Sequence, residues 1–194
     1  MKDMDDIIKQ AVSILSHDGL IVYPTETVYG LGGDAFSDIA IERVYDAKNR
    51  LRGKPISIAI SDIEMLACVA YLDPAAEAFI NRFLPGPVTV ILKAKSCVPT
   101  ELTGGTGMIG IRIPSHPLAL RLITQFDAPI TATSANLHGA KEPRTPEECT
   151  IPRELLIDGG MLPGIPSTVV DLPAKQILRA GAGVDPVAKF LLTL

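Results

Sequence analysis

The chain has no apolar run near the roughly 18 residues that a membrane-spanning helix needs, so the sequence predicts no such helix. Its first residues, M-K-D-M-D-D, are acidic and lack the apolar core of a secretory signal, and we therefore expect a cytoplasmic protein. Cysteine is scarce: Cys68, Cys97 and Cys149 form no C-x-x-C pair, which argues against a metal cluster. Cys68 falls in a helical pattern and is expected to fill the core.

Several common catalytic signatures are also missing. No G-x-x-x-x-G-K-[ST] occurs, which excludes a P-loop. Residues 105–110 match G-x-G-x-x-G, but they precede an apolar, β-rich run instead of following a strand and opening a helix, so they do not predict a dinucleotide site. No serine lies in a G-x-S-x-G turn, and the three histidines have no partner pattern. The sequence therefore offers no evident nucleophile with its base.

What the sequence does contain is typical of a globular protein. Hydrophobic residues make up 47% and charged residues 21%, and the 194 residues are enough for one domain, which we place at 1–194. The patterns predict helices at 3–17, 38–48, from 61, 74–84, 117–126 and from 185, and strands at 20–23, 56–60, 88–93, 108–113, 129–134, 155–157, 167–172 and 176–179. The expected helix starts include Ser37 as a cap, a capping box at 61–64, and Asp73 followed by a proline at the first helical position. Because helices and strands are interleaved without strict alternation, we expect an α/β fold with a mixed sheet.

An unusually polar loop follows the first predicted strand. Pro24 should end that strand, and the glycines at positions 30, 32 and 33 allow sharp turns and close approach to a ligand. Threonine, glutamate and tyrosine side chains lie between these residues. Ligands of open α/β sheets bind at the carboxyl ends of strands, so this loop is a candidate site. A plain polar connection to the next helix is an equal alternative.

A basic segment lies between the second predicted helix and the next strand. It places four cations within seven residues, at positions 48, 50, 52 and 54. Cations near a helix end stabilise the helix dipole, which is one interpretation. However, the charges continue into a loop shaped by Gly53 and Pro55, where fixed cations suit a polyphosphate. We favour phosphate binding.

Polar groups at three other places complete the candidate set. Residues 131–136, T-A-T-S-A-N, end a strand with hydroxyls and an amide, which can bind phosphate or ribose or can simply cap their own turn. Arg112 lies in an otherwise apolar strand, so it must face either an anion or water. Arg179 precedes a small-residue loop, and Ser167 begins a strand. This mixture suits a site that positions anionic substrates.

Taken together, the motifs resemble one family in order along nearly the whole chain. The matching blocks are PTETVYGLG at 24–32, KNR at 48–50, PGPVT at 85–89, IRIPSHP at 111–117, SAN at 134–136, STVVD at 167–171 and LRAG at 178–181. In this order they resemble the Sua5/YrdC/TsaC family of L-threonylcarbamoyladenylate synthases, in its short, single-domain bacterial form.

The resemblance implies a reaction and a fold. L-Threonine, bicarbonate or CO2, and ATP with Mg2+ would give L-threonylcarbamoyl-AMP and pyrophosphate. The product would feed formation of N6-threonylcarbamoyladenosine in tRNA through a separate threonylcarbamoyl transferase complex, and weak direct contact with tRNA stays open. The implied fold is a twisted mixed α/β sheet, flanked by helices, around a large positively lined cavity.

The resemblance also assigns residues by position. It implies that Lys48 and Arg50 are catalytic, and that ATP is bound by Lys48, Arg50, Lys54, Met108, Ser134, Asn136 and Arg179. It implies that threonine is bound by Thr27, Arg112, Ala132, Thr133 and Ser167. No resident metal ligands are implied. Ala59 stands where some members carry a histidine near the threonine, which puts one polar contact in doubt.

Two other functions stay open at this stage. One is a double-stranded RNA-binding or ribosome-assembly module, against which the formal net charge of −4 and the lack of aromatic stacking motifs both weigh. The other is a carbamoyl-adenylate site like the related domain of hydrogenase maturation proteins, which normally belongs to a much longer chain.

Overall fold

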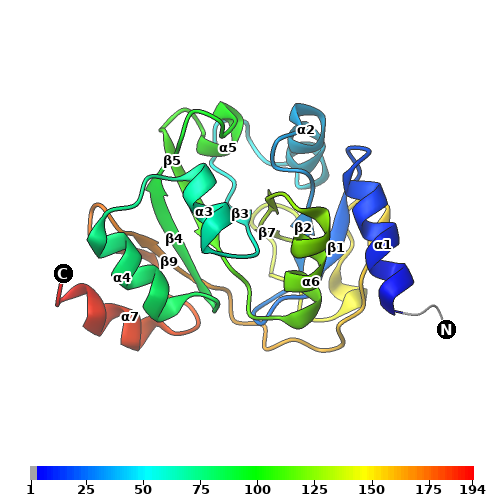
Figure 1. Cartoon of the computed structure of the whole chain (residues 1–194). Coiled ribbons are helices and arrows are strands. Elements are labelled where there is room, and N and C mark those ends of the chain that lie inside the picture. Colours follow the sequence, from blue (N-terminus) through cyan, green and yellow to red (C-terminus); the bar gives the residue numbers. More distant parts are fainter. Residues whose placement is uncertain (1–3) are drawn as a thin grey trace.

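The structure is a computed structural model that describes residues 4–194 (Figure 1). Its helices are α1 (Met4–Leu15), α2 (Asp38–Ala47), α3 (Ile63–Val69), α4 (Pro74–Phe83), α5 (Thr100–Thr103), α6 (Pro117–Phe126) and α7 (Val184–Leu191), with a 3-10 turn at Pro146–Glu148. Its strands are β1 (Ile21–Tyr23), β2 (Gly30–Gly32), β3 (Ile58–Ala59), β4 (Val88–Lys93), β5 (Met108–Arg112), β6 (Ile130–Thr131), β7 (Thr133–Ser134), β8 (Leu155–Leu156), β9 (Thr168–Asp171) and β10 (Gln176–Arg179).

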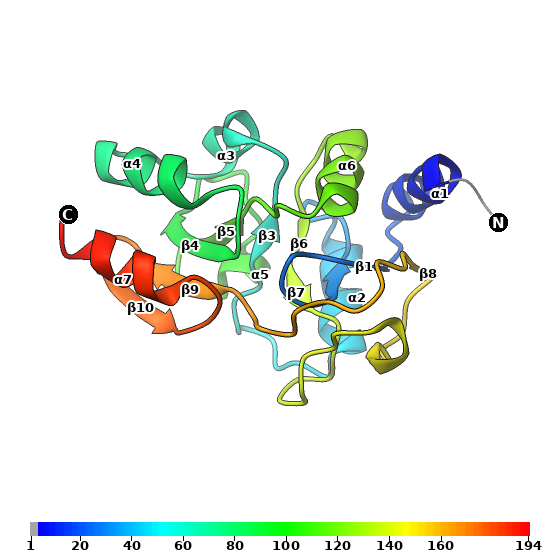
Figure 2. The ribbon, with the colours of Figure 1, turned by 90° about the horizontal axis from the view of Figure 1, so that it is seen from below.

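The strands form two mixed sheets that lie side by side (Figures 1 and 2). The larger sheet has the order β10-β9-β4-β5-β3-β6, and the smaller has the order β7-β2-β1-β8. In the larger sheet β4 runs antiparallel to β5 and parallel to β9, while β3 runs parallel to β5. The predicted mixed α/β architecture is confirmed, with the strands divided between two sheets.

The predicted strand 129–134 connects the two sheets. Its first half, β6, pairs with β3 in the larger sheet, and its second half, β7, pairs with β2 in the smaller one. Between them Ala132 donates its backbone N–H to the carbonyl of Ser57 at 2.7 Å. The small polar residues of this segment therefore lie where the sheets meet, which periodicity along one strand could not show.

Helix caps fix where α2, α3 and α4 begin. The Ser37 hydroxyl accepts from the N–H of Ala40 at 3.2 Å, as expected from its place before α2. Asp73 caps α4, with proline at the first turn, as the sequence also predicts. For α3 the predicted capping box at Ser61 is wrong: the cap is Asp62, whose carboxylate accepts from the N–H of Met65 at 2.8 Å. A carboxylate at that position also interacts favourably with the helix dipole.

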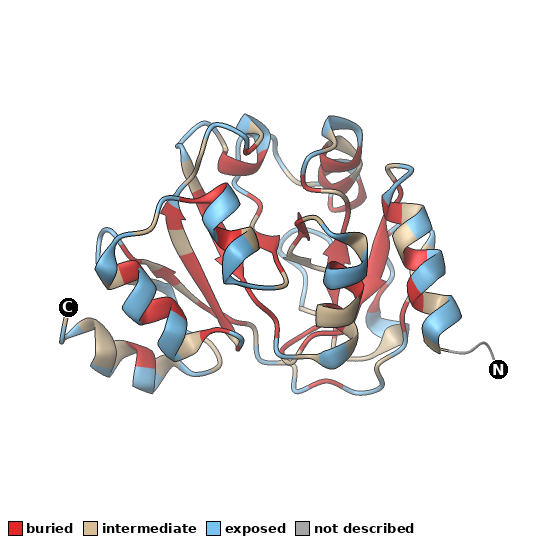
Figure 3. Ribbon diagram, viewed as in Figure 1, coloured by how far each residue is buried: buried red, intermediate tan, exposed pale blue. Residues whose placement is uncertain are grey.

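The helices bury the sides that face the sheets (Figure 3), and the buried apolar residues form two core clusters. One cluster joins α3, α4 and α7 to the larger sheet. A second cluster joins α1 and α6 to β1 through Ile8, Leu15, Ile21, Leu122 and Ile123, all fully buried. The outer faces of the helices are exposed, so the sheets are held in place by one-sided amphipathic helices.

Cys68 is exposed and not part of the core, because α3 directs Leu66 and Val69 inward instead; Cys149 is the buried cysteine. Within residues 4–194, none of the helices has the length and the apolar character needed to cross a membrane.

Candidate active site

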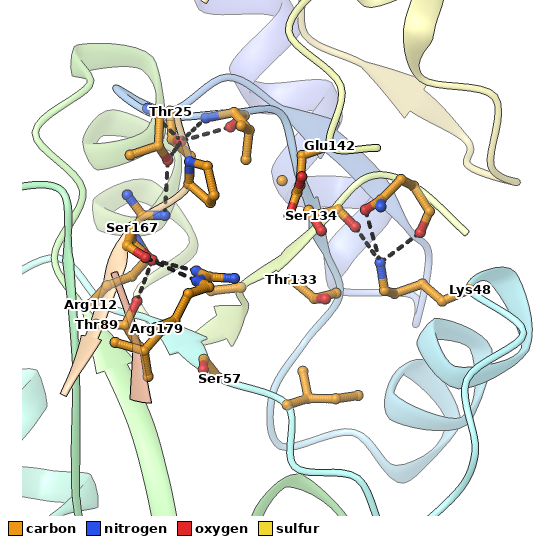
Figure 4. A pocket seen from close by; sticks show the side chains of 18 of the residues that line it. Thr25, Lys48, Ser57, Thr89, Arg112, Thr133, Ser134, Glu142, Ser167 and Arg179 are labelled. Atoms are coloured by element: carbon orange, nitrogen blue, oxygen red, sulfur yellow. Dashed lines mark hydrogen bonds between the residues drawn. The ribbon is translucent and has the colours of Figure 1, made fainter. Parts of the chain in front are cut away.

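A cavity of about 530 Å³ lies between the two sheets and is lined by most of the predicted site residues (Figure 4). All of the predicted residues line it except Lys54 and Met108. In Figure 4, Lys48 and Ser134 lie on one side, Arg112, Ser167 and Arg179 on the other, with Thr133 between them. The segments that form the cavity are far apart in sequence, so the fold brings the predicted groups together.

Lys48 connects the basic loop, residues 48–55, to the turn at Ser134–Asn136 that follows β7. It is buried at the end of α2, and its ammonium donates to the carbonyl of Asn136 at 2.7 Å, to the carbonyl of Ser134, and to Oδ1 of Asn136 at 3.5 Å. These contacts use all three N–H donors of the side chain. Lys48 therefore holds the Ser134–Asn136 turn, the S-x-N turn, beside the basic loop and places a positive charge there.

The surroundings of Lys48 destabilise its charged form. Burial, followed by the positive charge of Arg50, lowers the pKa of Lys48 to about 8, and Glu142 acts in the opposite direction. Among the described residues no carboxylate forms an ion pair with Lys48. A buried ammonium bound only to neutral oxygens is favourably placed for an anionic ligand nearby.

Arg50 enters the same cavity just beyond a reversal of the chain at Asn49, which has a φ of 48°. Its Nη2 donates to the carbonyl of Pro55 at 2.8 Å, and its Nη1 lies 3.4 Å from Nδ1 of His138. Its Nε is buried without a hydrogen-bond partner in the described part of the protein. Lys54 is exposed outside the lining, with its ammonium 3.5 Å from Nε2 of His138.

The polar loop after β1 folds around its own threonines. The Thr25 hydroxyl donates to the carbonyl of Val28 at 2.7 Å and accepts from the N–H groups of Thr27 and Val28. The hydroxyls of Thr25 and Thr27 are 2.8 Å apart. This turn buries Thr27 completely while keeping it in the cavity wall.

Arg112 is shielded from water and has side-chain partners. It is buried, its Nη2 forms an ion pair with Glu26, and its Nη1 donates to the Thr27 hydroxyl at 3.3 Å. Glu26 also accepts from the N–H of Ser115 at 3.0 Å, which fixes the carboxylate. The Nε of Arg112 is buried with no partner among the described residues. Ala59 lies opposite Arg112 in the β3–β5 register and offers no polar group there.

On the far wall, Arg179 and Ser167 contact each other. Arg179 donates from Nε to the carbonyl of Ser167 and from Nη2 to its hydroxyl, both at 3.0 Å. The Ser167 hydroxyl lies 2.9 Å from that of Thr89 on β4. Met108 is at the start of β5, opposite Lys93, and not in the cavity wall.

Sequence reasoning missed several lining residues that carry polar groups, namely Ser57, Thr89, His138 and Glu142. Thr89 lies within the PGPVT block, so the resemblance marked its segment without singling it out. The pairing of β4 with both β5 and β9 places it beside Ser167. His138 and Glu142 follow the S-x-N turn in a loop with no motif of its own.

Gly181 allows the chain to pass close to Ser167. A Cβ at Gly181 would lie 2.2 Å from the carbonyl oxygen of Pro166 and 2.7 Å from backbone atoms of Ser167. Gly181→Ala should therefore destabilise the protein by about 3 kcal/mol, lowering the midpoint of thermal unfolding by roughly 6–12 °C. The measurement is thermal unfolding followed by circular dichroism.

The control for that variant is Gly53→Ala. Gly53 has a φ of 82°, and a Cβ at this position would have nothing within 4 Å, so only the backbone conformation opposes alanine. That cost is about 1–2 kcal/mol. Equal stability of Gly181→Ala and wild type would show that residues 166–167 do not approach residue 181 as described.

The comparisons with known proteins decide the family. The sequence model of the Sua5/YciO/YrdC family, described as "Telomere recombination", matches residues 13–181. The chain belongs to this family. A threonylcarbamoyl-AMP synthase from Pyrococcus abyssi is 39% identical over 95% of the chain. The chain spans 57% of that relative's length.

Solved structures of the Sua5/YciO/YrdC family confirm the fold. The structure of Pyrococcus abyssi Sua5 complexed with L-threonine has a TM-score of 0.89 at 34% identity, covering 98% of this chain and 58% of that one. The structure of Escherichia coli YciO has a TM-score of 0.86 at 31% identity, covering 96% and 95% of the two chains. The predicted α/β fold of the YrdC type is thus confirmed.

Proposed function

We propose that this Sua5/YciO/YrdC protein synthesises L-threonylcarbamoyl-AMP and pyrophosphate from L-threonine, bicarbonate or CO2, and ATP. The proposal treats residues 1–194 as one catalytic domain. The observation that carries it is the Lys48 ammonium, which joins the basic loop to the Ser134–Asn136 turn inside one cavity. The synthase name of the Pyrococcus relative and the threonine bound to its solved counterpart support the same assignment.

The chemistry needs positioning and charge more than a covalent partner. The threonine amine adds to CO2 and loses a proton, giving a carbamate. A carbamate oxygen then attacks the α-phosphate in line, and the bond to the β-phosphate breaks, releasing pyrophosphate. Arg50 and the Ser134–Asn136 turn would bind the phosphates, and the Lys48 charge beside them would offset negative charge in the transition state.

The opposite wall suits the amino acid. Arg112 has a buried Nε without a partner among the described residues and a second donor, Nη1, beside Thr27, and an N–H of the guanidinium can donate to a carboxylate oxygen. We infer that the threonine carboxylate binds there and that Ala132, Thr133 and Ser167 line the rest of its pocket. Arg179, fixed by Ser167, would contact the nucleotide from the same wall.

Lys54 and Met108 are weaker members of the proposed ATP site. Both lie outside the cavity lining, so any contact with ATP would be at the edge of the site. Met108 would contact ATP mainly through its backbone. Lys54 is exposed near His138, where it can approach a phosphate that extends out of the cavity.

Magnesium fits as a companion of ATP. Within the described residues, no group of three or more His, Cys, Asp or Glu side chains could hold a metal, and Glu142 is the one carboxylate in the cavity wall. Mg2+ commonly binds through one or two carboxylates together with substrate phosphates. We infer that Glu142 would hold an Mg2+ ion bound to ATP, and that the ion would supply further positive charge to the phosphate oxygens.

The remaining partners are proposals that rest on this activity. The adenylate would pass to a threonylcarbamoyl transferase complex that modifies tRNA. A cytoplasmic location and weak direct contact with tRNA stay predictions.

The pKa of Lys48 predicts an alkaline limb in the activity. Phosphate oxygens nearby would raise this pKa above its free value of about 8. The ammonium's contribution to ATP binding is then complete below pH 8 and is lost as the pH rises towards the pKa of the bound state. We expect kcat/KM for ATP to fall above about pH 8, measured at saturating threonine.

Lys48→Arg is the matched variant, since a guanidinium stays charged throughout this range. It should retain less activity overall but show no such limb. A wild-type profile that stays level to about pH 10 would contradict the assignment.

The activity itself is tested by incubating the protein with ATP, Mg2+, bicarbonate and L-threonine. Pyrophosphate and the adenylate, detected by mass spectrometry, should both appear and both depend on threonine. A reaction without threonine is the control, and one with carbamoyl phosphate in place of threonine and bicarbonate tests the hydrogenase-maturation type of chemistry. Pyrophosphate release that ignores threonine would overturn the proposal.

A further inference from the structure

His138 lies beside Lys48, Arg50 and Lys54, which together form a basic cluster, on the loop that follows the Ser134–Asn136 turn. Its backbone N–H donates to the carbonyl of Lys48 at 2.9 Å, which holds the loop against the end of α2. Its Nδ1 is 3.4 Å from Nη1 of Arg50, and its Nε2 is 3.5 Å from the ammonium of Lys54. The imidazole therefore has a cation beside each ring nitrogen.

This arrangement of charged and polar groups lacks a hydrogen-bond acceptor. A neutral imidazole has one acceptor nitrogen and one N–H, so it can accept from Arg50 or from Lys54 but not from both. One of the two contacts must set a donor against a donor. In the described part of the protein, no carboxylate forms an ion pair with Arg50, Lys54 or His138. In the described residues, Arg50, Lys54 and His138 therefore form a group of basic side chains without an anionic partner.

The charged groups around His138 come from each neighbouring segment. Lys48 ends α2, Arg50 and Lys54 belong to the basic loop, and Glu142 lies farther along the same loop as His138 in the cavity wall. Partial desolvation, then the charges of Arg50, Lys54 and Lys48, lower the pKa of His138. The imidazole is therefore largely neutral at pH 7 in the free protein.

We propose that His138 is a further phosphate-binding residue, which takes up a proton when a polyphosphate occupies the basic cluster and so links ATP and pyrophosphate affinity to pH. The inference rests on the proposed function, because it requires that the triphosphate lies at this loop. The anion satisfies all the cations at once, and protonation gives His138 a second N–H in place of its acceptor. The donor-to-donor contact is then replaced by contacts from several donors to the ligand.

The sign of the effect follows from which state holds the proton more tightly. The bound state has the higher pKa, so the contribution of His138 to affinity is complete below the free-state pKa and is lost as the pH rises through the bound-state pKa. A difference of about one pKa unit would make binding about tenfold tighter at low pH than at high pH. This range lies below the limb expected from Lys48, so the two groups can be separated.

The test measures proton uptake directly. Binding of ATP with Mg2+, and of inorganic tripolyphosphate, is followed by isothermal titration calorimetry in buffers of different ionisation enthalpy at about pH 7. Wild type is compared with His138→Gln and His138→Lys, and with His17→Gln as the control. His17 is an exposed histidine at the end of α1 whose ring contacts the carbonyl of Ser13. The difference between each variant and wild type removes the protonation of the ligand itself.

We expect the wild type to take up more protons than His138→Gln, by up to about one proton per site, and His17→Gln to match wild type. His138→Lys should bind as tightly as wild type at low pH without the extra uptake, because its charge is permanent. Equal uptake in wild type and His138→Gln would overturn the role of His138 while leaving ATP binding in place. Failure of wild type to bind either polyphosphate would overturn the proposed function as well.

Discussion

Arg50→Ala is expected to lower the rate of threonine-dependent pyrophosphate release by about two to three orders of magnitude, as loss of one charge-stabilising donor does in other active sites. The side chain lines the cavity and has a buried Nε without a partner among the described residues, so it has donors to spare for a phosphate. Most of the loss should be in kcat, since charge on the transferring phosphate is greatest in the transition state. Steady-state kinetics with ATP, L-threonine and bicarbonate all saturating measures it.

Arg52→Ala is the matched control for Arg50→Ala. Arg52 lies in the same loop, but it is exposed and forms ion pairs with Glu42 and Asp46 on the face of α2. Its replacement removes the same charge from the segment without removing a group from the cavity. We expect nearly wild-type turnover. Similar losses in the two variants would mean that the loop acts only through its overall charge.

Lys48→Ala should lose activity to a similar extent, for a partly different reason. The variant removes the ammonium and also leaves the carbonyls of Ser134 and Asn136 without their donor, so the turn that presents their side chains can shift. Circular dichroism of the variant separates a local loss of this kind from unfolding. A folded Lys48→Ala protein with wild-type turnover would refute the part given to Lys48.

Loss of Arg112 is expected to raise the KM for L-threonine by about 100-fold, because removing one partner of a buried charge contact costs roughly 2–5 kcal/mol. The KM for ATP should change by no more than about threefold, since Arg112 faces Thr27 and not the basic loop. Replacing Arg112 alone would leave Glu26 as an unpaired, largely buried carboxylate. The informative protein is therefore the double variant Arg112→Gln/Glu26→Gln, assayed by varying each substrate in turn.

Glu26→Gln by itself separates charge from position in this pair. It keeps the guanidinium and a group that can still accept from Arg112, so the KM for threonine should rise far less than in the double variant. An equal rise of both KM values in the double variant would show that Arg112 supports the whole cavity and does not select the amino acid.

Local signals in the sequence predict several of the elements around the site. Ser37 before α2 and Asp73-Pro74 before α4 predict where these helices begin, and the apolar β-branched residues of β4 and β5 predict the central strands. The basic loop and the S-x-N turn are each candidates on their own residues, without any sign that they are close together. Their proximity depends on the chain crossing from the larger sheet at β6 to the smaller sheet at β7, which no local sequence signal indicates.

The rest of the site depends on partners that are distant in sequence. Arg112 is evident from the sequence as a charge in need of an anion or water, but the anion in this structure is Glu26 from the loop after β1. Thr89 meets Ser167 only because β4 pairs with β9, and His138 meets Arg50 and Lys54 only because its loop is bound to the end of α2. Neither contact leaves a local pattern. Hydrophobic periodicity describes one face of one element and carries no information on such pairs.

The central claim is that one triphosphate lies across the basic loop and the Ser134–Asn136 turn, with the amino acid at Arg112. A crystal structure of the protein with a non-hydrolysable ATP analogue, Mg2+ and L-threonine tests it most directly. The account predicts phosphate oxygens within about 3 Å of the Arg50 guanidinium and of donors in the turn, and the threonine carboxylate at a similar distance from Arg112. A nucleotide bound outside this cavity, or phosphates held away from both segments, would contradict it.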